Sequence, residues 1–143
     1  MLLKTLVGIT LGAVFAFLSA LHGFWAFGGK WGSAATVPLV DGKPTFTPTR
    51  GMTLLVAAAL MSAALVVLTR ANVIFTWVPS WTSQWSSAVL GAIFVARSIG
   101  EFRWVGFFKS VRNTTFALWD TWLYSPVCLA LGLGALWLAF GVL

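Results

Sequence analysis

A few ionisable and hydrogen-bonding side chains interrupt an otherwise apolar sequence: His22, Arg97, Glu101, Asp120 and Tyr124. Arg97 and Glu101 are four residues apart, and so are Asp120 and Tyr124. Residues with this spacing lie on one face of a helix. Carboxyl and imidazole groups can exchange protons with a substrate, which makes Glu101, Asp120 and His22 the candidate catalytic residues.

These polar residues also have a purely structural interpretation. In that case Arg97 pairs with Glu101, and Asp120 caps a helix or pairs with Arg103. His22 then hydrogen-bonds a loop carbonyl. A functional acid would instead face a cavity without a cationic partner. The predicted ligand-binding residues are His22, Trp25, Trp31, Arg97, Glu101, Arg103, Trp119, Asp120 and Tyr124.

Tryptophans gather around these polar residues. Trp25, Trp31, Trp104, Trp119 and Trp122 all fall on the same predicted side of the membrane. Tryptophan is typical of the headgroup level of a bilayer, which favours an aromatic belt. The alternative is a pocket in which the rings contact an apolar or cationic ligand.

The composition determines the class of protein. Hydrophobic residues make up 59% of the 143 residues and charged residues only 8%, whereas a soluble domain carries about 25% charged residues. We therefore predict a polytopic membrane protein. One cysteine, one histidine and three acidic residues offer no basis for a disulfide, a metal site or a haem, and we expect no cofactor. The net charge of +6 is attributed to contact with anionic membrane lipids and not with nucleic acid.

Apolar runs of about 20 residues, the length that spans a bilayer, predict four transmembrane helices. We expect an all-α bundle that forms a single domain over residues 1–143. Thr49 and Thr114–Thr115 are expected to start the second and fourth helices, and Pro126 is expected to kink the fourth. The polar faces of the first, third and fourth helices then converge near one membrane face. The predicted helices cover residues 3–27, 50–70, 83–100 and 115–141.

The first long loop is predicted to contain a small β-hairpin outside the membrane. Asp41-Gly42 separates two β-prone runs, and this dipeptide suits a type I′ turn, whose two central residues have positive φ. Pro38 and Pro44 cannot donate to a strand ladder, so they must face outward or break the pairing. A second long stretch, residues 100–117, mixes charged and aromatic residues and is predicted to lie in the membrane interface.

The basic residues predict the orientation in the membrane. Lys4 and Arg70 fall on the side of the termini, and the long-loop side carries the others. Lys and Arg collect in cytoplasmic loops. Both termini are therefore predicted outside, with loops 28–49 and 101–114 in the cytoplasm. The basic residues on the long-loop side are Lys30, Lys43, Arg50, Arg97, Arg103, Lys109 and Arg112.

Three stretches, beginning at Leu21, Arg97 and Asp120, together resemble a known family. They read LHGFWAFGGKWG, RSIGEFRWVGFFK and DTWLYSPVCL. The family consists of small bacterial four-helix membrane proteins and is known only as a domain of unknown function. The resemblance covers nearly the whole chain. It implies a bacterial inner membrane protein and implies no activity.

The sequence leaves three functions open. The first is binding of a hydrophobic small molecule, lipid-like or isoprenoid-like, at the polar and aromatic site near one membrane face. The second is an isomerase or cyclase acting on a lipid-like substrate, with Asp120 or Glu101 exchanging the proton. Similar ingredients occur in helical bundles of the emopamil-binding, sterol-isomerase type. The third is an accessory or structural subunit of a larger membrane complex or a homo-oligomer, joined through glycine-rich helix faces.

Overall fold

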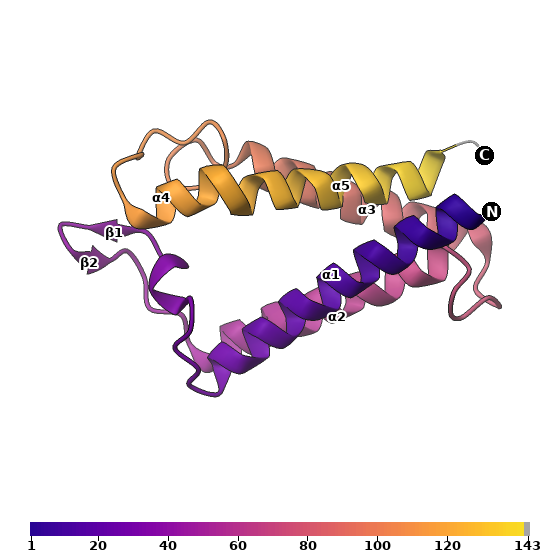
Figure 1. Cartoon of the computed structure of the whole chain (residues 1–143), viewed down its shortest axis with the longest axis horizontal. Coiled ribbons are helices and arrows are strands. Elements are labelled where there is room, and N and C mark those ends of the chain that lie inside the picture. Colours follow the sequence, from indigo (N-terminus) through magenta and orange to yellow (C-terminus); the bar gives the residue numbers. More distant parts are fainter. Residues whose placement is uncertain (142–143) are drawn as a thin grey trace.

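The computed structural model describes residues 1–141, and four long helical segments dominate it (Figure 1). The predicted all-α fold with a small hairpin is confirmed. Of the shorter elements, η1 is a 3₁₀ turn and η2 is a π-helical turn. The elements in chain order are α1 (Leu2–Ala26), η1 (Ser33–Ala35), β1 (Leu39–Val40), β2 (Lys43–Pro44), α2 (Arg50–Arg70), α3 (Ser80–Ile99), α4 (Thr115–Trp119), η2 (Asp120–Tyr124) and α5 (Ser125–Phe140).

Three of the long segments have the length and apolar composition needed to cross a membrane. They are α1, α2 and the continuous segment Thr115–Phe140 formed by α4, η2 and α5. The chain is therefore an integral membrane protein. Helix α3 has 20 residues, which corresponds to about 30 Å, the thickness of the hydrocarbon core. Its first half is rich in serine and threonine, so a fourth crossing by α3 stays a prediction.

Capping residues and a proline mark the starts of the later helices, within three residues of the predicted positions. The Thr49 hydroxyl accepts the backbone N–H three residues on at 3.2 Å, and Thr114 does the same at 3.0 Å. Each hydroxyl satisfies one of the free donors at the start of a helix. Helix α3 begins at Ser80, three residues before its predicted start. Pro79 directly precedes it, and proline is tolerated at a helix start because its missing N–H has no partner there.

The helices form two antiparallel pairs, α1 with α2 and α3 with α5 (Figure 1). In the second pair the backbones touch. A Cβ added to Gly91 would lie 2.8 Å from the Gly132 oxygen, and one added to Gly132 would lie 2.9 Å from the Gly91 oxygen. Buried serines add hydrogen bonds within each pair: Ser87 donates to a carbonyl of α5 at 2.8 Å and Ser19 to a carbonyl of α2 at 2.7 Å. Small and hydroxylated residues of this kind are typical of helix interfaces in membranes.

The two pairs meet at the end of the molecule that holds the N-terminus and diverge toward the end that holds the long loops, like the arms of a V (Figure 1). Phe15 is fully buried where they meet and packs edge to face on Phe94, with ring centroids 5.0 Å apart. Arg70 Nη2 donates to the Ala139 oxygen at 3.0 Å and joins the two arms near the end where they meet. The buried core consists of Leu11, Phe15, Leu60, Ala63, Ala64, Val67, Leu131, Ala135 and Leu138.

The predicted hairpin in the first loop is confirmed. Strands β1 and β2 are antiparallel, with Val40 opposite Lys43. Asp41 and Gly42 have φ angles of 51° and 75°, as a type I′ turn requires. The hairpin lies at the loop end of the molecule (Figure 1), and η1, which precedes it in the chain, contacts α4.

Candidate functional site

Asp120 is fully buried at the loop end of the fourth helical segment and accepts hydrogen bonds on both carboxylate oxygens. Oδ1 accepts from Arg97 Nη2 at 3.0 Å. Oδ2 accepts from Lys109 Nζ at 3.0 Å, from the Gly106 backbone N–H at 2.8 Å and from Ser125 Oγ at 3.2 Å. A buried carboxylate requires both a counter-charge and hydrogen bonds. These five residues, the Asp120 cluster, meet both conditions.

Lys109, which our sequence analysis missed as a site residue, is the buried cation of the Asp120 cluster. Its side chain is 1% exposed. Besides bonding Asp120, its Nζ donates to the Gly106 oxygen at 3.0 Å and to Thr121 Oγ1 at 2.6 Å. All three ammonium protons therefore have an acceptor. The sequence carries no signal for this pairing, because Arg103 beside Phe102 has a similar aromatic setting in the same loop and forms no ion pair within residues 1–141.

Two glycines shape the loop at residues 100–114 and bring Lys109 to Asp120. Gly100 and Gly106 have φ angles of 88° and 90°, a region that strongly favours glycine. The chain crosses itself at these two glycines, and the two backbone segments are in contact. A Cβ added to Gly100 would overlap the backbone of Val105, and one added to Gly106 would overlap the backbone of Ile99 and Gly100. The stretch predicted to lie in the interface is thus an irregular loop folded back on itself. Asp120 anchors this loop to the helices.

Asp120 opens the π-helical turn η2, and Pro126 lies two residues beyond the last residue of this turn, Tyr124. Proline cannot donate to the carbonyl four residues before it, and its ring crowds that carbonyl. A wider turn at this point relieves the crowding, and π turns inside α-helices frequently occur at functional sites. The structure accommodates Pro126 in this way.

Glu101 does not pair with Arg97. The ion pair between these two residues that the structural interpretation predicted is therefore wrong. Glu101 is exposed, and its carboxylate accepts the backbone N–H of Trp104. Arg97 pairs with Asp120 instead. The alternative pairing of Asp120 with Arg103 is also wrong, since Asp120 is shared between Arg97 and a buried lysine. The glycine crossing explains the difference, because it turns the chain away from helix α3 directly before Glu101.

His22 bonds its own helix and not a loop carbonyl, which corrects the structural alternative for this residue. Its Nδ1 donates to the Leu18 oxygen at 2.8 Å, and its ring packs edge to face on Trp25 with centroids 5.0 Å apart. Trp25 Nε1 in turn donates to the Trp31 oxygen at 2.7 Å. His22, Trp25 and Trp31 therefore form one contact group on the arm of α1 and α2, while Asp120 lies on the other arm.

Tyr124 connects the two arms at the loop end. Its hydroxyl donates to the Ala35 oxygen in η1 at 3.2 Å. Trp31, Trp119 and Trp122 are exposed, as expected of an aromatic belt. The predicted site residues thus separate into the ion pair of Arg97 and Asp120, the His22 contact group, Tyr124 bonded to the first loop, and side chains that face outward.

The Asp120 cluster is suited to anchoring the loop and not to proton exchange with a substrate. Asp120 has no exposed surface and is shared by two cations. A general acid or base must come within hydrogen-bond reach of the reacting atom. The geometry therefore favours the structural interpretation of this acid.

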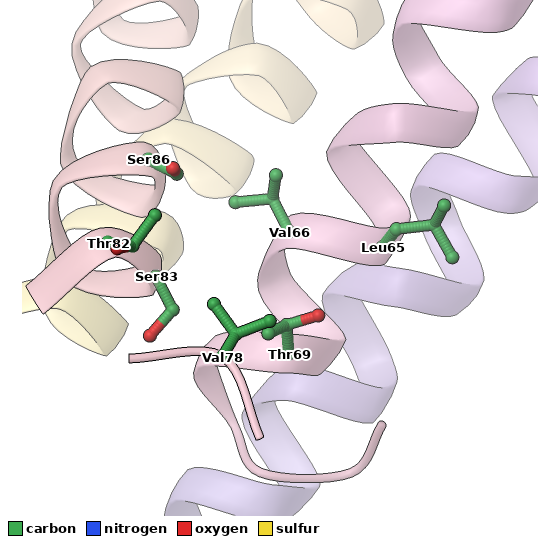
Figure 2. Close-up of a pocket in the computed structure, with 7 residues that line it drawn as sticks. All are labelled: Leu65, Val66, Thr69, Val78, Thr82, Ser83 and Ser86. Atoms are coloured by element: carbon green, nitrogen blue, oxygen red, sulfur yellow. The ribbon is translucent and has the colours of Figure 1, made fainter. Parts of the chain in front are cut away.

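A second candidate site is the groove between α2 and α3, which consists of two linked hollows. One has a volume of about 180 Å³ and the other about 560 Å³. Val66 and Ser86 line both. Figure 2 shows the smaller hollow, with Thr82, Ser83 and Ser86 on α3 across from Val66 of α2. The larger hollow is lined by Ala59, Ser62, Ala63, Val66, Trp85, Ser86, Val89, Leu90 and Ile93.

Comparison with protein families finds one family model that matches this chain. The family model described as "Protein of unknown function (DUF3995)" matches residues 15–135, a range that contains both long loops and the Asp120 cluster. The chain belongs to this family. No curated protein and no solved structure matches it. Membership of DUF3995 confirms the family resemblance and assigns no activity.

Proposed function

We propose that this DUF3995 protein binds a lipid-like molecule whose apolar tail lies in the groove between α2 and α3. The observation that carries the proposal is the groove itself, with its hollows of about 180 and 560 Å³. The larger hollow is an open depression on the side of the molecule, and its volume falls within the range of about 300–1,000 Å³ that small-molecule pockets have. An apolar molecule can enter sideways from the bilayer without passing through water.

The lining of the larger hollow suits a hydrocarbon chain. Val66, Val89, Leu90 and Ile93 supply apolar side chains, and the small side chain of Ala59 leaves the space between the helices open. Hydroxyl groups are concentrated in the smaller hollow, which Thr69, Thr82, Ser83 and Ser86 line (Figure 2). The groove therefore offers mostly dispersion contacts along its length.

In this proposal the polar end of the ligand lies beside Arg97 of helix α3. Ile93 lines the groove, and Arg97 follows four residues later on the same helix face. Asp120 engages Nη2 of Arg97, whereas Nη1 is buried without a hydrogen-bond partner among residues 1–141. An unpaired buried donor is unfavourable by about 1–3 kcal/mol. A small shift of the side chains around Arg97 would let an oxygen of the ligand accept from Nη1.

The two other functions suggested by the sequence have less support. An isomerase or cyclase needs an acid that reaches its substrate, whereas Asp120 is buried in its cluster and Glu101 lies outside the groove. A subunit of a larger complex would use the same groove to dock a helix of a partner protein. The experiment that tests lipid binding therefore treats a docked helix as a contrary outcome.

Two neighbouring alanines of α2 provide the test and its control. Both are exposed, but Ala59 lines the groove and Ala58 does not. We expect Ala59→Phe to fill the larger hollow and to lower the amount of co-purifying lipid about tenfold, which corresponds to losing about 1.4 kcal/mol of apolar contact. Native mass spectrometry of the purified protein measures the retained lipid.

Ala58→Phe adds the same side chain outside the groove and should retain lipid as the unchanged protein does. Equal lipid retention in both variants would contradict the proposal. So would a cross-link from the groove to a helix of another protein in place of lipid.

We also propose that the protein lies in a bacterial inner membrane with both termini outside, because most of its basic residues lie at the loop end. Alkaline phosphatase fused to the C-terminus should then be active, and a cytoplasmic fluorescent reporter at the same place should be dark. The same reporters inserted at the hairpin tip, between Asp41 and Gly42, should give the reverse pattern. Fluorescence from the C-terminal fusion would overturn this orientation.

A further inference from the structure

We infer that the loop at residues 100–114 docks the headgroup of an anionic membrane lipid through Arg103 and Arg112, with Phe102 and Phe108 inserted beside it. This inference goes beyond the groove between α2 and α3 and does not depend on whether that groove is occupied. The loop joins α3 to α4, and α4 begins a membrane-crossing segment. The surface of the bilayer is therefore its immediate neighbour.

Backbone hydrogen bonds bring the two arginines together. The Ser110 N–H donates to the Phe102 oxygen at 3.1 Å, and the Val111 N–H donates to the Arg103 oxygen at 3.0 Å. The segment that carries Arg103 therefore runs beside the segment that leads into Arg112. Asp120 stabilises this loop conformation by accepting a hydrogen bond from the backbone N–H of Gly106.

Both guanidinium groups are held in place before any lipid arrives. Arg112 donates from Nε to the Lys109 oxygen at 3.2 Å and from Nη2 to the Phe107 oxygen at 3.4 Å. The Arg103 guanidinium lies over the Trp104 ring, 5.1 Å from its centroid. Guanidinium groups bind phosphate oxygens with two parallel hydrogen bonds. Restricting a side chain beforehand reduces the entropy that binding costs.

The charge of the loop calls for an anionic partner. Arg103 and Arg112 are exposed, and neither forms an ion pair within residues 1–141. Lys109, the third cation of the loop, is already occupied by Asp120. Glu101 is the one acid in the loop sequence, and its carboxylate is bonded to the loop backbone.

Exposed aromatic residues favour a lipid over a soluble phosphate. Phe102 and Phe108 are 63% and 62% exposed and flank the arginines in the same loop. Apolar rings beside basic groups are typical of segments that lie in the membrane interface, where the rings enter the hydrocarbon boundary and the charges stay at the phosphate level. A free phosphate would engage the arginines alone.

The test uses protein in nanodiscs made from equal amounts of dioleoylphosphatidylglycerol and dioleoylphosphatidylcholine. Native mass spectrometry gives the ratio of the two lipids that stay bound. We expect phosphatidylglycerol to be enriched. The enrichment should fall about fivefold in Arg103→Gln and about twenty-five-fold in the double variant Arg103→Gln/Arg112→Gln, because each basic residue near an anionic surface contributes a factor of about five.

Lys43→Gln is the matched control, because Lys43 is exposed at the same end of the molecule but lies on the hairpin. It should leave the enrichment unchanged, as should Ala59→Phe and an excess of inorganic phosphate. Equal lipid ratios in the unchanged protein would overturn the inference, as would an unaltered ratio in Arg103→Gln, which disturbs no backbone hydrogen bond of the loop. A loss of enrichment in Lys43→Gln as large as in Arg103→Gln would also overturn it, since diffuse charge would then explain the preference.

Discussion

Replacing Asp120 with asparagine is expected to lower the free energy of unfolding by about 3–5 kcal/mol, the cost of removing one partner from a buried ion pair. The amide leaves Lys109 buried without its counter-charge, and its single oxygen cannot take the places of both carboxylate oxygens that accept from Arg97 and Lys109. Equilibrium unfolding in detergent micelles measures the change. The protein should still insert into the membrane, because the apolar segments that direct insertion are unaltered.

Two further variants separate a structural role of Asp120 from a general effect of charge. Glu101→Gln removes an exposed acid and should change the stability by at most about 0.5 kcal/mol. Adding Lys109→Met to Asp120→Asn should recover part of the loss, because no buried charge is then left without a partner. If Asp120→Asn keeps the full stability and loses only a bound ligand, the cluster is a ligand site and not an anchor.

Replacing Gly100 with alanine is expected to cost about 3 kcal/mol or more, from φ strain of about 1–3 kcal/mol together with backbone overlap of about 1–3 kcal/mol. Its φ of 88° and ψ of −175° lie in a region that is nearly exclusive to glycine. An added Cβ would also overlap the Val105 oxygen in the crossing segment. The loop would be pushed away from Asp120, whose Oδ2 accepts from Gly106.

Gly42→Ala is the control for backbone strain alone. Gly42 has a φ of 75°, but nothing lies within 4 Å of an added Cβ, so its loss should be limited to about 1–2 kcal/mol. Combining Gly100→Ala with Asp120→Asn should cost less than the sum of the two losses, because both break the same contact. Equal losses for Gly100→Ala and Gly42→Ala would show that the glycine crossing does not hold the loop.

The features predicted correctly from the sequence are those determined over short distances. Apolar runs and threonine caps place α1, α2 and the start of α4 within a residue or two, and Asp41-Gly42 specifies its own turn. Membrane helices are fixed by length and hydropathy before they pack, so their bounds are visible in the chain.

The features that could not be predicted depend on the path of the loop and on helix packing. The sequence suggested Arg103 of the second loop as a partner for Asp120, and the backbone at Gly100 and Gly106 decides that Lys109 of this loop reaches it instead. The groove arises because the two arms diverge from contacts such as Phe15 with Phe94. Hydrophobic periodicity indicates which face of a helix is buried, but it does not determine the angle at which two helix pairs pack against each other.

The most direct test of lipid binding by this DUF3995 protein is an experimental map of the protein in lipid nanodiscs. We expect elongated density that does not belong to the protein, lying between α2 and α3 beside Val66 and Ser86 and ending near Arg97. The density should be absent from a map of Ala59→Phe and present in a map of Ala58→Phe. A groove closed by packed side chains, or filled by a helix of another chain, would contradict the account.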